Sequence, residues 1–392
     1  MPADSAPRDF DLVVLGATGF TGELTAAYLA EHAPAGLRWA LAGRNPAKLH
    51  AVRDRLAKID PSLGELPLLG ADSSDAASLR AVAEATKVVV TTVGPYLEHG
   101  EPLVAACAAA GTDYLDLTGE PEFVDRMYVA HHDAAVASGA RIVHACGFDS
   151  IPHDLGAWFT VQQLCSGDPI TLRGVVRAGA TASGGTFHSA MGAMSRARQM
   201  REAMVARRKK EGRPAGRRSR AVAGKPHRDR TLGLWLLPMP TIDPFVVARS
   251  GAALESYGPD FRYSHYAGLK TLRYTIGGAV AVSGLLVAAQ IKPIRNLLKR
   301  RVPQGEGPSE QRRAKSWFTV DFVGESAGST VHTRVSGGDP GYTETAKMLA
   351  ESAMCLVLDD NPTTSGQVTT ATAMAENLLA RLKKAGMRFE VV

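Results

Sequence analysis

The sequence is poor in cysteine, and this shortage limits the classes of protein to which the chain can belong. Its four cysteines, Cys107, Cys146, Cys165 and Cys355, stand far apart with no CxxC spacing. This pattern excludes a disulfide framework and a clustered zinc site, and it is typical of free or buried thiols in a reducing compartment. Cys146 has no partner residue that would make it a nucleophile, so we expect it to be structural, and we expect no metal site.

The N-terminal residues lack the features of a secretory signal. The stretch MPADSAPRDFD contains neither a basic region nor an apolar core, so we expect no signal peptide and a cytoplasmic location. With 392 residues, the chain is too long for one compact core and is expected to form more than one domain.

Acidic residues are scarce in one segment. Between Arg196 and Arg230 there are 14 Lys or Arg and 3 Asp or Glu, whereas the remainder holds 31 basic and 36 acidic residues. A concentrated basic patch indicates an acidic partner rather than general nucleic-acid binding. Because 211–230 is also rich in Gly and Pro, we expect a mobile loop there after a helix over 186–210. A solvated loop without a partner is the alternative.

Charge is absent from a second segment, YTIGGAVAVSGLLVAAQ, which covers Tyr274–Gln290 between Arg273 and Lys292. Its length is at the short limit for a transmembrane helix. Three interpretations stay open: a membrane-spanning helix, a buried core helix, or an apolar surface element that touches membrane or lipid, which would make the protein peripheral to the membrane.

Strands and helices alternate over the first 150 residues. Apolar runs predict strands at 11–15, 38–42, 66–69, 88–92, 114–117 and 141–144, and helical patterns stand between them. The pattern predicts an α/β fold with a Rossmann-type doubly wound parallel sheet over 1–150. A second α+β domain is expected over 151–340, with a hairpin at 317–335. We expect C-terminal helices over 341–392 to pack back on the first domain.

Three glycines stand between the first predicted strand and helix in LVVLGATGFTG. Gly16 permits a tight turn, Gly19 lets a phosphate approach, and Gly22 lets helix and strand pack. The free N–H groups at a helix N-terminus suit a pyrophosphate, so we predict a dinucleotide site that also includes Thr18 and Phe20.

No acidic residue ends the second predicted strand, where an NAD-preferring site has one. Arg44 and Asn45 stand there instead, and a cation suits a 2′-phosphate, which predicts NADP. Asp72 is expected either to meet the adenine or to cap a helix with Ser73 and Ser74.

Further loops end strands at the same sheet edge. Val93, Gly94 and Pro95 in TTVGPY are expected to line the cofactor, with Tyr96 close to the nicotinamide. The polar residues of DLTGE (116–120) and CGFDSIPHD (146–154) are expected mostly to make caps and turns.

Together, GATGFTG, LAGRN, TTVGPY, VAACAAAGTDYLDLTGE and ACGFDSIPHDLG make the chain resemble the saccharopine dehydrogenase-like oxidoreductases. Within them it looks most like the trans-acting enoyl reductases of actinobacteria. The resemblance implies a Rossmann domain, a second α/β domain, and reduction of a carbon–carbon double bond on a polyketide or lipid acyl chain carried by a synthase or acyl carrier protein.

Enoyl reduction needs a proton donor, and the candidates are Tyr96, His153 and His188. Two other functions stay open. An amino-acid or imine dehydrogenase would need an arginine for the substrate carboxylate, for which Arg173 and Arg177 are available. A non-catalytic NADP-binding protein could instead bind an anionic membrane surface through NLLKRR and the apolar segment.

Overall fold

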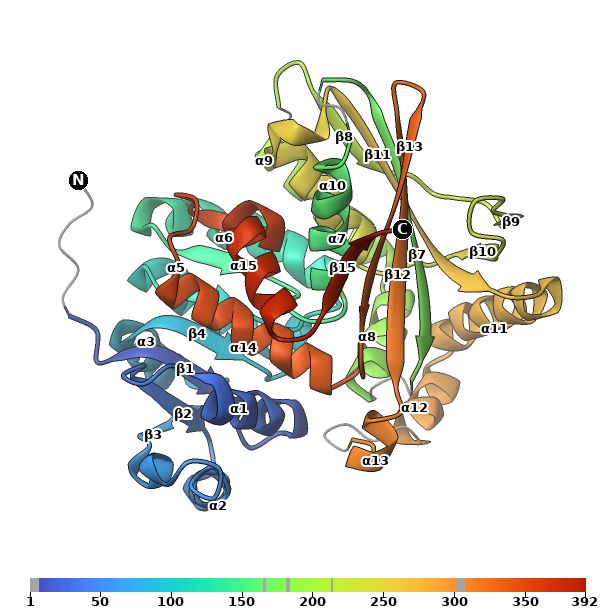
Figure 1. Cartoon of the computed structure of the whole chain (residues 1–392). Helices are drawn as coiled ribbons and strands as arrows, with labels where there is room; N and C mark the ends of the chain where they lie inside the picture. The colour runs from blue at the N-terminus through green and yellow to red at the C-terminus, as the bar shows by residue number, and fades with distance from the viewer. Residues whose placement is uncertain (1–6, 165–166, 181–183, 213, 302–306) are drawn as a thin grey trace.

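A computed structural model describes residues 7–164, 167–180, 184–212, 214–301 and 307–392; Cys165 and Arg213 lie outside these ranges. Two β-sheets stand side by side (Figure 1). One hydrophobic cluster joins them, since it includes Val88 and Val90 of the first sheet and Val320 and Phe322 of the second. The space between the sheets is therefore part of one packed body.

The first sheet is parallel and has seven strands in the order β14-β6-β5-β4-β1-β2-β3. In β1 (Phe10–Leu15), which lies between β4 and β2, Leu12 and Val14 enter one hydrophobic cluster and Val13 and Leu15 enter the other, so both faces are covered. The predicted doubly wound Rossmann-type fold is confirmed. The elements are β1 (Phe10–Leu15), α1 (Phe20–His32), β2 (Trp39–Gly43), α2 (Pro46–Leu56), η1 (Pro61–Glu65), β3 (Leu68–Gly70), α3 (Ala76–Ala85), β4 (Thr86–Thr91), α4 (Tyr96–His99), α5 (Glu101–Ala110), β5 (Asp113–Leu115), α6 (Pro121–Ser138) and β6 (Arg141–Val143).

The second sheet is mixed, with the order β15-β13-β12-β7-β11-β10-β9, and β8 also pairs with β11. The predicted hairpin is present, because β12 pairs antiparallel with β13 up to Ser326 and Ser329. The elements are α7 (Ile151–Val161), β7 (Ile170–Gly179), α8 (Gly184–Ser195), α9 (Ala197–Glu211), β8 (Arg218–Ala221), β9 (His227–Arg228), β10 (Trp235–Pro238), α10 (Asp243–Ala253), η2 (Glu255–Tyr257), β11 (Asp260–Leu269), α11 (Leu272–Gln290), α12 (Lys292–Arg301), α13 (Glu310–Arg313), β12 (Trp317–Ser326) and β13 (Ser329–Gly337).

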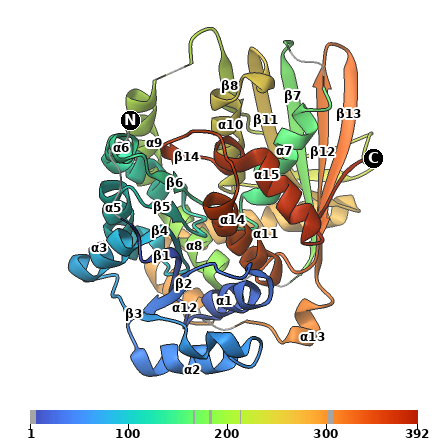
Figure 2. The same cartoon turned by 60° about the vertical axis from the view of Figure 1, so that its left-hand side comes forward.

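The C-terminal residues bind the two sheets together. They form α14 (Thr343–Leu358), β14 (Gly366–Val368), α15 (Thr370–Lys384) and β15 (Arg388–Val391). α14 packs on α1 and β4, and β14 extends the first sheet, whereas α15 packs on α7 and β15 pairs with β13 of the second sheet. In the view of Figure 2, α14 and α15 lie between the strands of the two sheets. The segment thus contains strands as well as helices and contacts both sheets.

Two expectations for the basic segment were wrong. The single helix expected over 186–210 is divided at Arg196, which takes a non-helical backbone conformation while its guanidinium donates to Glu122 of α6 at 2.6 and 2.8 Å. The loop expected over 211–230 contains β8 and β9, because β8 pairs with β11 and β9 with β10.

Candidate functional site

The glycine turn at the end of β1 has the shape that a dinucleotide needs. Gly16 has a φ of +89°, and a Cβ on Gly22 would lie 2.2 Å from the Gly16 carbonyl oxygen. These two glycines are required by the protein's own backbone and by the contact between helix and strand.

Gly19 differs from them because the protein leaves space beside it. A Cβ there would meet only the Gly16 carbonyl oxygen at 3.4 Å, and Gly19 is the N-cap of α1 without a side-chain cap. The first N–H groups of α1 therefore open on the cavity that Gly19, Phe20, Thr21 and Gly22 line. This cradle fits a pyrophosphate bound by backbone N–H groups.

The residues expected at the 2′-phosphate lie at the carboxyl ends of β2 and β3. Arg44 is exposed directly after β2. Asn45 is the N-cap of α2 and accepts a hydrogen bond from the Lys48 N–H at 3.0 Å. Asp72 accepts from the Ser74 N–H and hydroxyl, and Asp75 is the N-cap of α3. Capping thus accounts for Asn45 and a turn for Asp72, whereas Arg44 is exposed at this edge of the sheet.

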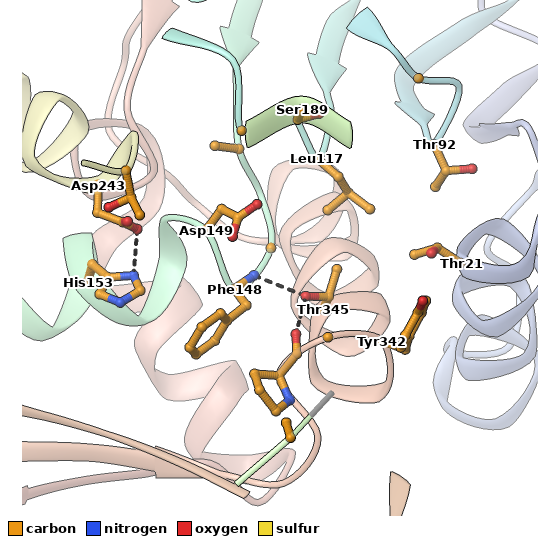
Figure 3. A pocket seen from close by; sticks show the side chains of 18 of the residues that line it. Thr21, Thr92, Leu117, Phe148, Asp149, His153, Ser189, Asp243, Tyr342 and Thr345 are labelled. Atoms are coloured by element: carbon orange, nitrogen blue, oxygen red, sulfur yellow. Dashed lines mark hydrogen bonds and ion pairs between the residues drawn. The ribbon is translucent and has the colours of Figure 1, made fainter. Parts of the chain in front are cut away.

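A cavity of about 590 Å³ lies between the glycine turn and the second sheet. Gly94, Pro95 and Tyr96 line it as expected, whereas Thr18 and Val93 are not among its lining residues. Thr21 and Thr92, which the motif did not single out, are. Figure 3 shows Thr21, Thr92 and Tyr342 at one end, Asp149 in the middle, and His153 with Asp243 at the other end.

Three buried polar side chains meet at the far end of the cavity. They are His153 of α7, Asp243 of α10 and His265 of β11. Nδ1 of His153 lies 2.8 Å from Oδ1 of Asp243, and Nε2 of His265 lies 3.7 Å from Oδ2 of Asp243. Nε2 of His153 is buried with no hydrogen-bond partner among the described residues. The cluster can therefore present a nitrogen to a ligand, and the sequence predicted only its first member.

Burial and neighbouring charges shift the pKa values of the acidic and imidazole groups in and beside this cluster. Burial raises the pKa of Asp243, but the adjacent His153 and His265 more than offset this, so the pKa lies below its ordinary value. Burial lowers the pKa of His265 to about 4. Burial and the Asp243 carboxylate raise the pKa of Asp149 to about 6. Near neutral pH, His265 is thus neutral and Asp243 ionised.

The same three side chains are chemically able to hold a cation. One ligand atom from each of His153, Asp243 and His265 lies within 4.8 Å of the others. Two imidazoles and a carboxylate are common ligands of divalent transition metals. No metal site was expected from the sequence, because the three residues are far apart and follow no ligand spacing.

His265 gives a prediction for stability. The unfolded chain takes up this proton near pH 6.5, whereas the folded protein takes it up only near pH 4, so stability is lost as the pH falls between these values. The loss should reach about 3 kcal/mol. Asp243, His153 and the Tyr263 hydroxyl, 3.0 Å from Nδ1, surround the ring.

Urea unfolding at pH 7, 5.5 and 4.5 tests this. His265→Gln should weaken the pH dependence, and the same change at exposed His99 should leave it intact. Parallel pH dependences for the wild type and His265→Gln would contradict the prediction.

Tyr96 is placed in the cavity wall, but its hydroxyl is committed to the backbone. It donates to the Thr91 carbonyl at 3.1 Å and accepts from the Leu117 N–H at 3.2 Å. Burial raises the pKa of Tyr96 well above its usual range. These bonds connect the ends of β4 and β5 through Tyr96 and engage its hydroxyl proton with the Thr91 carbonyl.

His188 lies on α8 and is half-buried, with its ring edge-on to Phe187. It is not among the residues that line the cavity, whereas its neighbour Ser189 is. Of the three predicted donors, His153 alone combines a place in the cavity with an unpartnered nitrogen.

The remaining acidic residues of the motifs hold the loops. Asp116 is fully buried and accepts from the Thr118 and Ala145 N–H groups. Glu120 accepts from the Tyr96 and Leu97 N–H groups, and Asp154 accepts from Ser250 and Thr370. Cys146 is fully buried, and burial raises its thiol pKa well above the usual value. The expected capping and structural roles match these contacts.

Among the residues that the structure describes, no lysine or arginine lines the cavity. Arg173, expected to bind a carboxylate in an amino-acid dehydrogenase, instead pairs with Asp229 at 2.7 Å and Glu325 at 2.6 Å. Arg177 lies over the Trp317 ring, 5.8 Å from its centroid. Neither side chain is available to clamp a substrate carboxylate in this cavity.

Comparisons with known proteins agree with this geometry. The family model of the saccharopine dehydrogenase NADP-binding domain matches residues 12–143. A trans-acting enoyl reductase of Mycobacterium tuberculosis is 35% identical over 97% of both chains, and one of Mycobacterium ulcerans is 34% identical over 98% of both. A second Mycobacterium tuberculosis protein, provisionally given that name, is 38% identical over 98% of both chains.

A solved structure shows the same fold. The apo saccharopine dehydrogenase (L-Glu forming) of Saccharomyces cerevisiae aligns with a TM-score of 0.59 at 13% identity, covering 98% of this chain and 100% of that chain.

Proposed function

The chain belongs to the family of the trans-acting enoyl reductases, and we propose that it is an NADPH-dependent oxidoreductase that reduces a carbon–carbon double bond of a carrier-bound polyketide or lipid acyl chain. The NADP-binding domain and the glycine cradle supply the cofactor site. The evidence for the substrate class comes from the residues that line the cavity.

The observation that supports the substrate class is a cavity with no arginine or lysine among its described lining residues. An acyl thioester has no carboxylate at the reacting end, whereas an amino acid needs a paired arginine or lysine. Leu117, Phe148, Val176 and Met239 provide apolar wall, and polar side chains stand at both ends with Asp149 between them. Such a cavity suits an acyl chain better than an amino-acid imine.

NADPH supplies a hydride when it is bound, and the protein must supply a proton. We assign that proton to Nε2 of His153, which would donate it to the substrate α-carbon as the β-carbon is reduced, and recover it from water. Asp243, at Nδ1 on the other side of the ring, stabilises the charged imidazole. Neutral His265 does not compete for the carboxylate.

The test is NADPH oxidation with enoyl thioesters of increasing chain length, beside imines formed from amino acids and keto acids. We expect turnover of the thioesters and a rise in kcat/KM with chain length, because each buried methylene contributes about 0.8 kcal/mol. Turnover of the imines alone would overturn the proposal in favour of an amino-acid dehydrogenase.

We further propose an acidic acyl carrier protein or synthase domain as the partner that presents the chain. Some cations of the basic segment already form ion pairs within the protein, so fewer of them are available to bind the partner. Arg207 is buried and pairs with Asp125 at 2.5 Å, and Lys210 pairs with Asp133 at 2.8 Å. Arg201, Arg208 and Lys209 of α9 are exposed and form no ion pair among the described residues. These three cations can meet an acidic surface.

Replacing Arg201, Arg208 and Lys209 with Ser should lower kcat/KM for a carrier-bound substrate about tenfold, because rim charges act on the rate of association. Activity on a small free thioester should stay constant, and salt should reproduce the loss in the wild type. A charge-matched control replaces exposed Lys58, Arg80 and Lys384 with Ser. Equal losses in both triple variants, or with both substrates, would contradict docking at α9.

We also propose that the protein works in the cytoplasm, peripheral to the membrane. Among the described residues, one helix, α11, is long and apolar enough to cross a membrane by length and composition. A non-catalytic role at the membrane would predict no NADPH oxidation with any acyl substrate.

A further inference from the structure

The apolar segment forms a helix that the protein leaves largely uncovered. In α11, 11% of the most apolar window is buried. Of the 17 large hydrophobic side chains that are exposed in the described chain, 9 lie on α11, α12 and the residue between them, including Tyr274 and Val280 at 68% and Val287 at 64%. This concentration overturns the interpretation as a buried core helix, and it calls for an apolar partner.

The topology shows how such a partner must lie. β11 ends directly before α11, and β12 follows α12 and α13. Both strands pair with β7 in the same sheet. Since α11 is a lone candidate span among the described residues, its two ends cannot be on opposite sides of a bilayer while the sheet stays whole. The transmembrane interpretation therefore conflicts with the fold.

One side of α11 rests on the protein. Thr275 and Ala289 are buried, Gly278 lies against Leu237 of β10, and the Gln290 side chain donates to the Met194 carbonyl of α8 at 2.7 Å. The opposite side carries Ile276, Val280 and Val287, which are all exposed. A surface helix ordinarily has polar residues on that side. α11 therefore lies on the protein with one side and carries an exposed apolar face from Ile276 to Val287 on the other side.

Charge identifies the partner. The sequence from Thr271 to Arg301 contains no Asp or Glu. Arg273 stands at the start of α11, and Lys292, Arg300 and Arg301 lie on α12, with all four side chains exposed. Cations that flank an apolar face complement lipid headgroups of negative charge. A second protein chain would not require this one-sided charge.

We infer that α11 and α12 lie in the plane of an anionic bilayer, with the apolar face of α11 among the acyl chains and the cations at the phosphates. This inference rests on the peripheral location proposed above, and it identifies α11 and α12 as the surface that contacts the membrane. α8, which supplies Ser189 to the cavity, packs on both α11 and α12. A docked protein would thus have one wall of its substrate cavity beside the membrane.

Vesicle flotation tests the inference with the full chain. Vesicles of phosphatidylcholine with phosphatidylglycerol should carry the protein to the top fraction, and vesicles of phosphatidylcholine alone should carry much less. Ile276→Ser, Val280→Ser and Val287→Ser together should lower the partition coefficient at least about tenfold. Lys292→Ser, Arg300→Ser and Arg301→Ser together should lower it about a hundredfold on anionic vesicles.

The control replaces with Ser three exposed valines outside α11 and α12, Val136 of α6, Val205 of α9 and Val222 after β8, and should float like the wild type. Flotation of the α11 variant equal to that of the control would overturn the inference. So would a halving of the solution mass in that variant, which would assign the face to a second copy. NADPH oxidation with a short soluble thioester, measured on the same samples, reports separately whether the proposed reaction fails.

Discussion

A Gly19→Val variant is expected to bind NADPH at least about a hundredfold more weakly, a loss of about 2.8 kcal/mol or more. The phosphate-binding N–H groups of α1 open beside Gly19, so a branched side chain would occupy the space of the pyrophosphate. The protein itself tolerates a Cβ at this position, whose backbone is extended with φ of −86° and ψ of 160°. Binding should therefore be lost without unfolding, as measured by NADPH fluorescence titration and thermal unfolding.

Two glycine controls make this outcome specific. Gly22→Ala should lower thermal stability as well as binding, because its Cβ would lie 2.2 Å from the Gly16 carbonyl oxygen. Gly64→Val, with no atom within 4 Å of the added Cβ, should change neither property. An unaltered NADPH titration in Gly19→Val would remove the glycine turn from the cofactor site.

The turn was predictable because its information is local. The buried strand, the glycines and the helix follow one another between Phe10 and His32, and each restricts the backbone of the next. The hairpin of β12 and β13 was predictable for the same reason. β14 was not, since three residues of a parallel strand carry no periodicity that separates them from a loop. Pairing with β6, more than 200 residues earlier, gives Gly366–Val368 its structure.

The cluster at the far end of the cavity, like β14, could not be predicted from local sequence information. His153, Asp243 and His265 come from two helices and a strand, so no spacing in the sequence joins them. His153 was predictable as a candidate because it follows the sixth strand at the ligand-binding edge of the sheet. Asp243 begins a helix and His265 lies within a strand, which are ordinary positions for both. The tertiary fold alone makes them neighbours.

The basic segment was misjudged for a different reason. Formal charge along a sequence counts cations, but it does not count the carboxylates that other elements bring to them. Glu122, Asp125 and Asp133 of α6 pair with Arg196, Arg207 and Lys210 and neutralise part of the charge of the basic segment. A smaller set of cations is consequently left for a partner.

His153→Gln is expected to lower kcat by about 10²–10⁴ on every enoyl substrate, or about 3–5.5 kcal/mol, because it removes the proton donor while keeping the side chain polar. Asp243→Asn should lower kcat as well, since the imidazole would lose its charged partner at 2.8 Å. Tyr96→Phe and His188→Gln are matched controls that should keep kcat within about tenfold. NADPH titration on each variant separates chemistry from binding.

Two further measurements decide between a proton donor and a metal at His153. In D₂O, the product should carry solvent deuterium at the α-carbon, and His153→Gln should slow its formation without changing its position. Exhaustive treatment with EDTA should leave kcat unchanged. If EDTA abolished turnover and zinc restored it, His153, Asp243 and His265 would be ligands of a metal, which their separation within 4.8 Å permits, and the donor assignment would be wrong. If kcat stayed constant in His153→Gln without any metal effect, the proton would have to come from another group in the cavity, and Asp149, with its pKa raised to about 6, stands next to it.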